Sequence, residues 1–80
     1  GSGGASEFLE YATRLVEQSR RAGTFVSGKV GSTAGALEDA TIYRVGREYI
    51  VVQYNRIMSY VPNAEPGGIV TEYQKLGGKL

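Results

Sequence analysis

The side chains that could do chemistry in this sequence are cations, phenols and carboxylates, because its 80 residues include no His and no Cys. The lack of Cys excludes disulfides, thiolate metal sites and thiol nucleophiles. The lack of His removes the usual imidazole acid or base and the commonest metal ligand. Any catalysis would therefore depend on Lys, Arg, Tyr or carboxylate groups, and we expect neither a metal nor another cofactor.

Arginine and tyrosine gather where β-branched and aromatic residues predict strands, over 41–45, 48–54 and 57–61. Two residues separate each consecutive pair of strands, Gly46-Arg47 in the first gap and Asn55-Arg56 in the second. Gly and Asn tolerate the positive φ of tight hairpin turns. The pattern therefore predicts an antiparallel meander.

Turns of two residues fix the register, pairing Val45 with Glu48 and Tyr54 with Ile57. Alternation then gives one apolar face, which carries Tyr43, Val45, Ile50, Val52, Tyr54, Ile57 and Val61. The opposite face is mixed and carries Ile42, Arg44, Tyr49, Val51, Gln53, Met58 and Tyr60. We expect the apolar face to pack against a helix and the mixed face to be half-solvated, as antiparallel sheets commonly are.

A helix is predicted over 7–22, with Ser6 as its N-cap and Gly23 as its left-handed stop. Its apolar stripe includes Phe8, Leu15 and Val16. A last strand is expected over 69–74, after the breakers of 62–68. The predicted fold is α+β, with one N-terminal helix packed on a four- to five-stranded antiparallel meander sheet.

The composition divides the chain into three parts. Residues 1–5 read as a tag or linker, 6–76 as a single α+β domain and 77–80 as a frayed tail. No apolar stretch approaches the length of a membrane span. The small residues of 31–36 predict a mobile segment.

Two glycine motifs admit a phosphate-binding interpretation. Residues 23–29 fit the G-x-x-x-x-G-K part of a P-loop, but Val30 stands where a magnesium-binding hydroxyl is needed and a helix precedes the motif. Residues 28–31 have the G-x-x-G form of the nucleic-acid clamp of KH domains, although Gly35 weakens the helix that should follow. The simpler interpretation is a strand that ends in a glycine-rich turn.

The order of one helix, a glycine-rich segment and a curled meander resembles the barnase/EndoU/colicin/RelE ribonuclease fold. The residues that carry the resemblance are Tyr43-Arg44-Val45, Tyr49-Ile50-Val51-Val52 and Ile57-Met58-Ser59-Tyr60-Val61. The fold supplies toxin domains of bacterial polymorphic and contact-dependent inhibition systems. The resemblance implies metal-independent cleavage of tRNA or rRNA through the 2′-OH. It also implies secretion at the C-terminal end of a larger protein, activity in the target-cell cytoplasm, and an immunity protein as partner.

Under this hypothesis Arg44 would stabilise the phosphorane, because its strand resembles the arginine-bearing strand of RelE, and Lys29 would be a second cation or a base. The expected catalytic residues are Lys29, Arg44, Glu72 and Tyr73. Substrate would be held by Arg47, Tyr49, Gln53, Tyr60 and Thr71, with the tyrosines Tyr49 and Tyr60 stacking a base.

The net charge of +1 opposes the nuclease hypothesis, because it supplies no general attraction for nucleic acid. Two alternatives stay open. One is a non-catalytic RNA- or protein-binding module that uses the same Arg and Tyr face. The other is an ordinary half-solvated sheet face with no special role.

Overall fold

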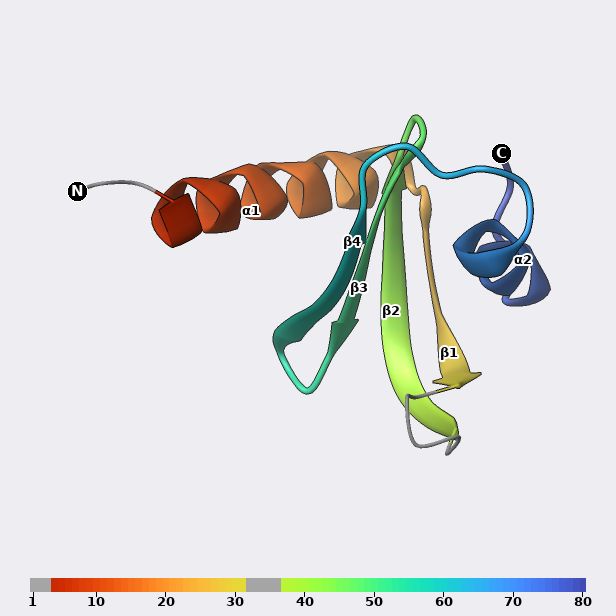
Figure 1. The fold of residues 1–80 in the computed structure, drawn as a ribbon. Helices are drawn as coiled ribbons and strands as arrows, with labels where there is room; N and C mark the ends of the chain where they lie inside the picture. Colours follow the sequence, from red (N-terminus) through yellow and green to blue (C-terminus); the bar gives the residue numbers. More distant parts are fainter. Residues whose placement is uncertain (1–3, 32–36) are drawn as a thin grey trace.

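In the computed structural model, which describes residues 4–31 and 37–80, a four-stranded sheet lies between two helices (Figure 1). The elements are α1 (Gly4–Ala22), β1 (Phe25–Gly31), β2 (Leu37–Val45), β3 (Glu48–Gln53), β4 (Arg56–Val61) and α2 (Gly68–Lys75). The strands are antiparallel and lie in the order β1-β2-β3-β4. This confirms the predicted α+β class with an N-terminal helix on a meander. The predicted mobile segment falls mainly on 32–36, outside the described residues.

Helix α1 ends where the sequence predicts, because Gly23 has a φ of 73° and its N–H bonds to the Arg20 carbonyl. It begins at Gly4, so Ser6 lies inside the helix and the prediction of Ser6 as the N-cap is wrong. The buried Ser19 hydroxyl donates to the Thr24 carbonyl at 2.8 Å, which ties the end of α1 to the start of β1.

The first hairpin has the predicted register, with Val45 opposite Glu48 and Tyr43 opposite Ile50. Gly46 has a φ of 61°, as the first central residue of a type II′ turn requires.

The second hairpin turns one residue earlier than predicted. Its central residues are Tyr54 and Asn55, with φ values of 51° and 63°, as in a type I′ turn, and Gln53 pairs with Arg56. A β-bulge follows, because Val52 pairs with Ile57 but Val51 pairs with Ser59. The bulge exchanges the faces of the last three residues of β4, Ser59, Tyr60 and Val61.

Helix α1 covers one face of the sheet through the buried residues Ala12, Leu15, Tyr43 and Ile50. Partly buried side chains extend this cluster, namely Val16, Val45, Val52, Ile57 and Tyr60. The apolar face predicted from the sequence therefore packs against the predicted helix. Tyr60 belongs to this face because of the bulge, whereas Val61 packs against the other cluster.

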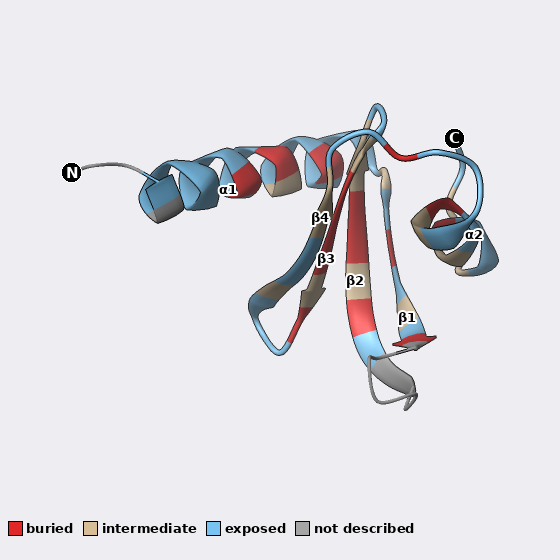
Figure 2. Ribbon diagram, in the orientation of Figure 1, coloured by how far each residue is buried: buried red, intermediate tan, exposed pale blue. Residues whose placement is uncertain are grey.

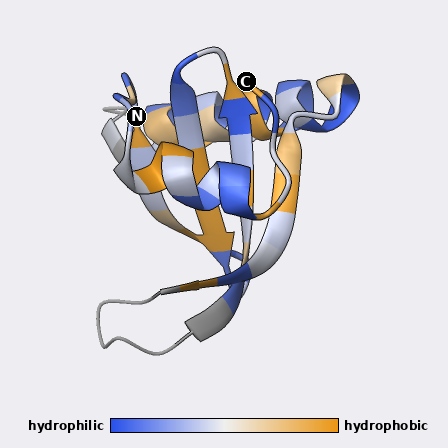
Figure 3. Ribbon diagram, turned by 90° about the vertical axis from the view of Figure 1, so that its right-hand side faces the viewer, coloured by the Kyte–Doolittle hydropathy of each residue, from blue (hydrophilic) through white to orange (hydrophobic). Residues whose placement is uncertain are grey.

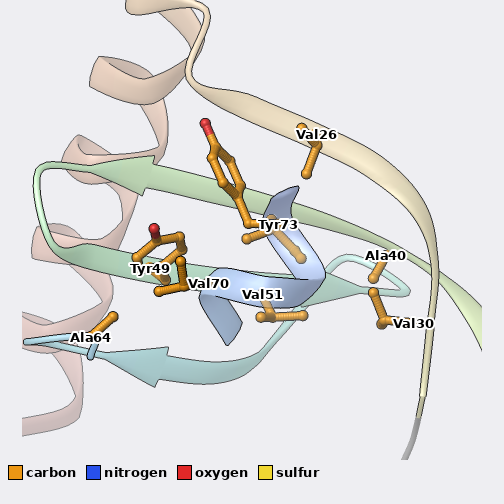
Figure 4. Packing of buried hydrophobic residues seen from close by; sticks show 9 residues of the cluster. Val26, Val30, Ala40, Tyr49, Val51, Ala64, Val70 and Tyr73 are labelled. Atoms are coloured by element: carbon orange, nitrogen blue, oxygen red, sulfur yellow. The ribbon is translucent and has the colours of Figure 1, made fainter. Parts of the chain in front are cut away.

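Helix α2 covers the opposite face, and the prediction of a strand over 69–74 is wrong (Figures 3 and 4). Its apolar residues Ile69, Val70, Tyr73 and Leu76 follow the spacing of one helix face, which carries them onto the sheet. The second cluster contains Val26, Val30, Ala40, Ile42, Tyr49, Val51, Ala64, Val70 and Tyr73. The mixed face is thus a second core rather than a half-solvated surface.

Gly28 and Lys29 lie inside β1, paired with Ala40 and Asp39, so neither glycine motif forms a phosphate-binding loop. Gly28 lies in close contact with the end of the Leu76 side chain, and a Cβ there would lie 2.4 Å from a methyl group of Leu76, so that side chain would have to shift. The glycine therefore lets the end of the α2 segment settle on β1.

We predict that Gly28→Ala lowers the free energy of unfolding by about 1–2 kcal/mol, because the added methyl group displaces Leu76. The same substitution should cost much less in a Leu76→Ala background. Urea denaturation of the four proteins of this double-mutant cycle measures the coupling. Ser59→Ala, on the exposed part of β4, is the control and should change stability by less than about 0.5 kcal/mol. Equal costs in the two backgrounds would contradict the packing of Leu76 on Gly28.

Candidate functional site

Arg44 is the best-anchored cation that the structure describes. Its guanidinium donates to the carbonyl of Gly46 at 2.8 Å and to the carbonyl of Lys79 at 3.2 Å. Its Nε lies 3.5 Å from the Tyr73 hydroxyl, and its guanidinium carbon lies 5.7 Å from the centre of the Tyr73 ring. These contacts fix the guanidinium beside α2 with two of its five N–H groups unassigned.

Arg47 lies in the β2–β3 turn close to Arg44. It donates to the Ala64 carbonyl at 3.3 Å, and the Ala64 N–H bonds back to the Arg47 carbonyl at 2.9 Å. Among the described residues, neither Arg44 nor Arg47 has an Asp or Glu within ion-pair distance.

The two arginines open onto one cavity of about 460 Å³ between the β2–β3 turn, the start of α2 and the C-terminal tail. Its lining residues are Arg44, Gly46, Arg47, Tyr49, Ala64, Pro66, Gly67, Val70, Gln74 and Leu80. No Asp or Glu side chain belongs to that lining. The N-terminus of α2 reaches the cavity through Gly67, and no side chain caps it. Two guanidinium groups and the positive end of a helix dipole make the cavity suitable for an anion.

The tail closes the cavity on one side. The Lys79 carbonyl accepts from Arg44 and from the Tyr73 hydroxyl, the latter at 3.3 Å. The Gly78 N–H bonds to the Tyr73 carbonyl at 2.9 Å, and a Cβ at Gly78 would lie 2.3 Å from the Tyr73 ring. Residues 78–79 therefore hold Arg44 in place, although the sequence predicts a frayed tail over 77–80.

Tyr73 and Tyr49 are almost fully buried, with exposed fractions of 1% and 2%, and their rings meet edge to face at 5.5 Å (Figure 4). Burial raises the pKa of Tyr49, while the nearby charge of Arg44 lowers it less. Tyr49 is therefore a core residue that offers no free plate for stacking a base. Tyr73 keeps its hydroxyl beside Arg44, so the predicted pair of Arg44 and Tyr73 is brought together.

Tyr60 lies on the other face of the sheet. Its hydroxyl donates to Glu48 at 2.7 Å, and its ring packs edge-on against Phe8 at 5.5 Å. Tyr11 donates to the same carboxylate oxygen. Hydrogen bonding to Glu48 raises the pKa of both phenols, with burial adding to the effect. Tyr60 thus joins α1 to the meander and does not share a surface with Arg44.

Lys29 is far from Arg44. It forms an ion pair with Asp39 at 3.6 Å, and both side chains are mostly exposed, so the pair adds little to stability. Arg44 lies five positions after Asp39 along β2, which is about 16 Å at the rise of a strand. The structure does not bring the two expected catalytic cations together.

The remaining expected site residues are Thr71 and Glu72 on α2 and Gln53 at the end of β3. Thr71 is exposed and Glu72 half-buried, because a helix turns them away from Tyr73. Gln53 is buried, and its Nε2 has no hydrogen-bond partner among the described residues. Of the nine expected site residues, the lining of this cavity contains Arg44, Arg47 and Tyr49.

Sequence reasoning missed the part of the cavity contributed by Ala64, Gly67 and the tail. A signal for α2 was available, because Ile69, Val70, Tyr73 and Leu76 recur at helical spacing directly after two glycines. No comparable signal marks the carbonyl of Lys79, since any residue supplies that group.

Comparison with known proteins returned no match among family models, curated sequences or solved structures. No helix over 4–31 and 37–80 is long and apolar enough to cross a membrane. The same residues contain no group of three side chains suited to holding a metal ion. A function for this domain must therefore be inferred from the geometry of the cavity.

We predict that Gly78→Ala lowers the free energy of unfolding by about 1–3 kcal/mol, because its methyl group overlaps the rigid ring of Tyr73 and displaces the tail. Lys79→Ala is the matched control: it keeps the carbonyl that Arg44 binds and should leave stability within about 0.5 kcal/mol. Urea denaturation compares the two variants. Equal effects would show that the tail does not pack on Tyr73.

A second prediction concerns alkaline pH. Because the folded-state pKa of Tyr60 is raised above 10.0, the folded protein holds its protons more tightly and stability falls as pH rises through and beyond about 10. Tyr60→Phe and Glu48→Gln should each flatten this decline, whereas Glu17→Gln, on the exposed side of α1, should not. Urea denaturation between about pH 9 and about pH 11 measures the slope. An unchanged slope in Tyr60→Phe would contradict the shared bond to Glu48.

Proposed function

We propose that this domain binds RNA, with a backbone phosphate held between Arg44 and Arg47. The observation that carries the proposal is the convergence of these two guanidinium groups on one cavity that no Asp or Glu side chain lines. Guanidinium groups match phosphate oxygens in a two-pronged geometry, and the bond is strengthened by charge. Arg44 is half-buried, and a half-buried arginine that lacks an acidic partner is otherwise costly to keep.

The shape of the cavity supports a phosphate rather than a base-reading site. Tyr49 contributes only an edge, so the stacking role expected of it is not available in this arrangement. The uncapped start of α2 adds a favourable dipole at the cavity, through Gly67. The expected binding is therefore weak in sequence preference and dependent on charge.

The finer hypothesis is that of the ribonuclease toxin: cleavage of tRNA or rRNA by its own 2′-OH, without a metal. The observation that bears on it is the Tyr73 hydroxyl at 3.5 Å from Arg44 Nε, a proton-bearing group beside a cation, although Tyr73 is buried and does not line the cavity. The lining of the cavity holds no Asp or Glu that could act as the base, so RNA binding is the primary proposal. Secretion, an immunity protein and action in a target cell belong to this finer hypothesis alone.

Binding is tested by fluorescence anisotropy with a short labelled single-stranded RNA. We expect Arg47→Ala to weaken binding about tenfold or more, since a charge-assisted hydrogen bond contributes about 1.5–3 kcal/mol. The affinity of Arg47→Lys should lie between those of the wild type and Arg47→Ala, because lysine keeps the charge but cannot make the two-pronged contact of a guanidinium group. The logarithm of the affinity should fall with the logarithm of the salt concentration with a slope of about −0.7, as expected for one neutralised phosphate on a single strand.

Arg56→Ala is the matched control, because Arg56 is also an exposed arginine at a hairpin but lies outside the cavity. Equal losses for Arg47→Ala and Arg56→Ala would show diffuse charge attraction and overturn the site, as would unchanged binding by Arg47→Ala. Inorganic phosphate as competitor separates a phosphate site from a site for bases. Cleavage is scored separately, by incubation of RNA with the wild type and with Tyr73→Phe, which keeps the ring and removes the hydroxyl.

A further inference from the structure

The N-terminal half of α1 extends past the edge of the sheet, beyond β4 (Figures 1 and 2). From residue 6 onward its first buried residue is Ala12, and residues 6–11 are all exposed. Three of them are large and apolar, with exposed fractions of 39% for Phe8, 58% for Leu9 and 44% for Tyr11. Phe8 and Tyr11 meet the Tyr60 ring but keep much of their surface in water, and Leu9 is more exposed than either. An amphipathic helix that exposes this much apolar surface is unusual for a monomer.

The edge strand β4, beside the N-terminal half of α1, also has few features that would prevent it from pairing with another chain. Beyond its first residue, Arg56, β4 carries no charged side chain, and Met58 is 56% exposed. The opposite edge strand, β1, carries Lys29, the kind of residue that commonly keeps edges apart. The bulge shortens the part of β4 that is free for backbone pairing, so α1 must supply most of any contact made here.

A groove of about 270 Å³ runs beside α1 on the same face of the sheet. Its lining is mainly apolar and includes Leu9, Val16, Val52 and Ile57. Helix α1 crosses the strands near the end that holds the β2–β3 turn, so the half of this face toward the β3–β4 turn is not covered by it (Figure 1). The groove lies between the helix and that uncovered half.

A two-fold axis perpendicular to the sheet, beside β4, would bring these features together. It places a second sheet edge to edge with the first, keeps both α1 helices on the same side, and runs them antiparallel. The overhanging half of each α1 then lies over the uncovered half of the other sheet. Leu9, which borders the groove, would be enclosed between the two helices.

The charges of α1 suit this arrangement. Glu7 and Glu10 are the charged residues of its first half, whereas Arg14, Arg20 and Arg21 outnumber Glu17 in its second half. Antiparallel pairing sets the acidic half of one helix beside the basic half of the other. The same pairing opposes the two helix dipoles. The helix is therefore complementary to itself, which selects a second copy of this chain as the occupant.

We propose that the chain forms a two-fold homodimer, in which the N-terminal halves of the α1 helices cross over β4 and pack in each other's grooves. The surface is separate from the cavity of Arg44 and Arg47, so the dimer does not depend on RNA binding.

Sedimentation velocity of the wild type from about 10 μM to about 1 mM tests the proposal. We expect the mass to rise from 8.6 kDa toward twice that value. Leu9→Glu should raise the dissociation constant about tenfold or more, and Glu65→Lys, on an exposed loop away from α1, should not change it. Circular dichroism confirms that each variant is folded.

A charge exchange makes the test specific to the antiparallel arrangement. Glu7→Lys/Glu10→Lys and Arg20→Glu/Arg21→Glu should each weaken the dimer, because each places like charges together at both ends of the helix pair. An equimolar mixture of the two variants should restore a dimer. A wild type that stays monomeric throughout, which would leave this surface to a different protein, overturns the proposal. So does a dimer that neither Leu9→Glu nor the charge variants weaken.

Discussion

The structure depends first on the need to cover both faces of a four-stranded sheet. Ile42 and Val51 face one way and Tyr43 and Ile50 the other, and all four are buried. A single helix can shield only one side, so a chain of this size must supply a second layer or leave a broad apolar surface in water. Helix α2 is that second layer, and the arrangement of the tail, the cavity and Arg44 follows from where it lies.

Local signals predicted the elements whose boundaries are set by nearby residues. The end of α1 at Gly23 and the register of the first hairpin follow from a left-handed glycine and a two-residue turn. The second hairpin was missed by one residue, because Tyr54 accepts a positive φ that its residue type disfavours. Beyond that turn the bulge moves Tyr60 to the α1 face, and no pattern in β4 announces it.

Sequence analysis identified Arg44, Arg47 and Tyr73 as candidate site residues, but it did not predict how the fold positions them relative to one another. Thr71, Glu72 and Tyr73 were expected on a strand over 69–74, whereas they lie on helix α2, which separates Thr71 from Tyr73. The mixed face is buried by residues that come much later in the sequence, because Val70 and Tyr73 of α2 cover Tyr49. Which polar side chains stay accessible is a tertiary property, and a single sequence constrains it weakly.

The two helices are attached to the sheet by different kinds of interaction. The end of α1 is tied in by hydrogen bonds, in which Thr24 and Ser19 meet the backbone of Arg44. Within the described residues, no backbone hydrogen bond joins α2 itself to a strand. Separating α2 from the sheet would therefore break side-chain packing and the tail contacts but leave the hydrogen bonds between the strands intact. The free energy of this local opening should be lower than the free energy of unfolding the whole domain. Native-state hydrogen exchange is therefore expected to show α2 as the less stable cooperative unit, and the meander with α1 as the more stable one.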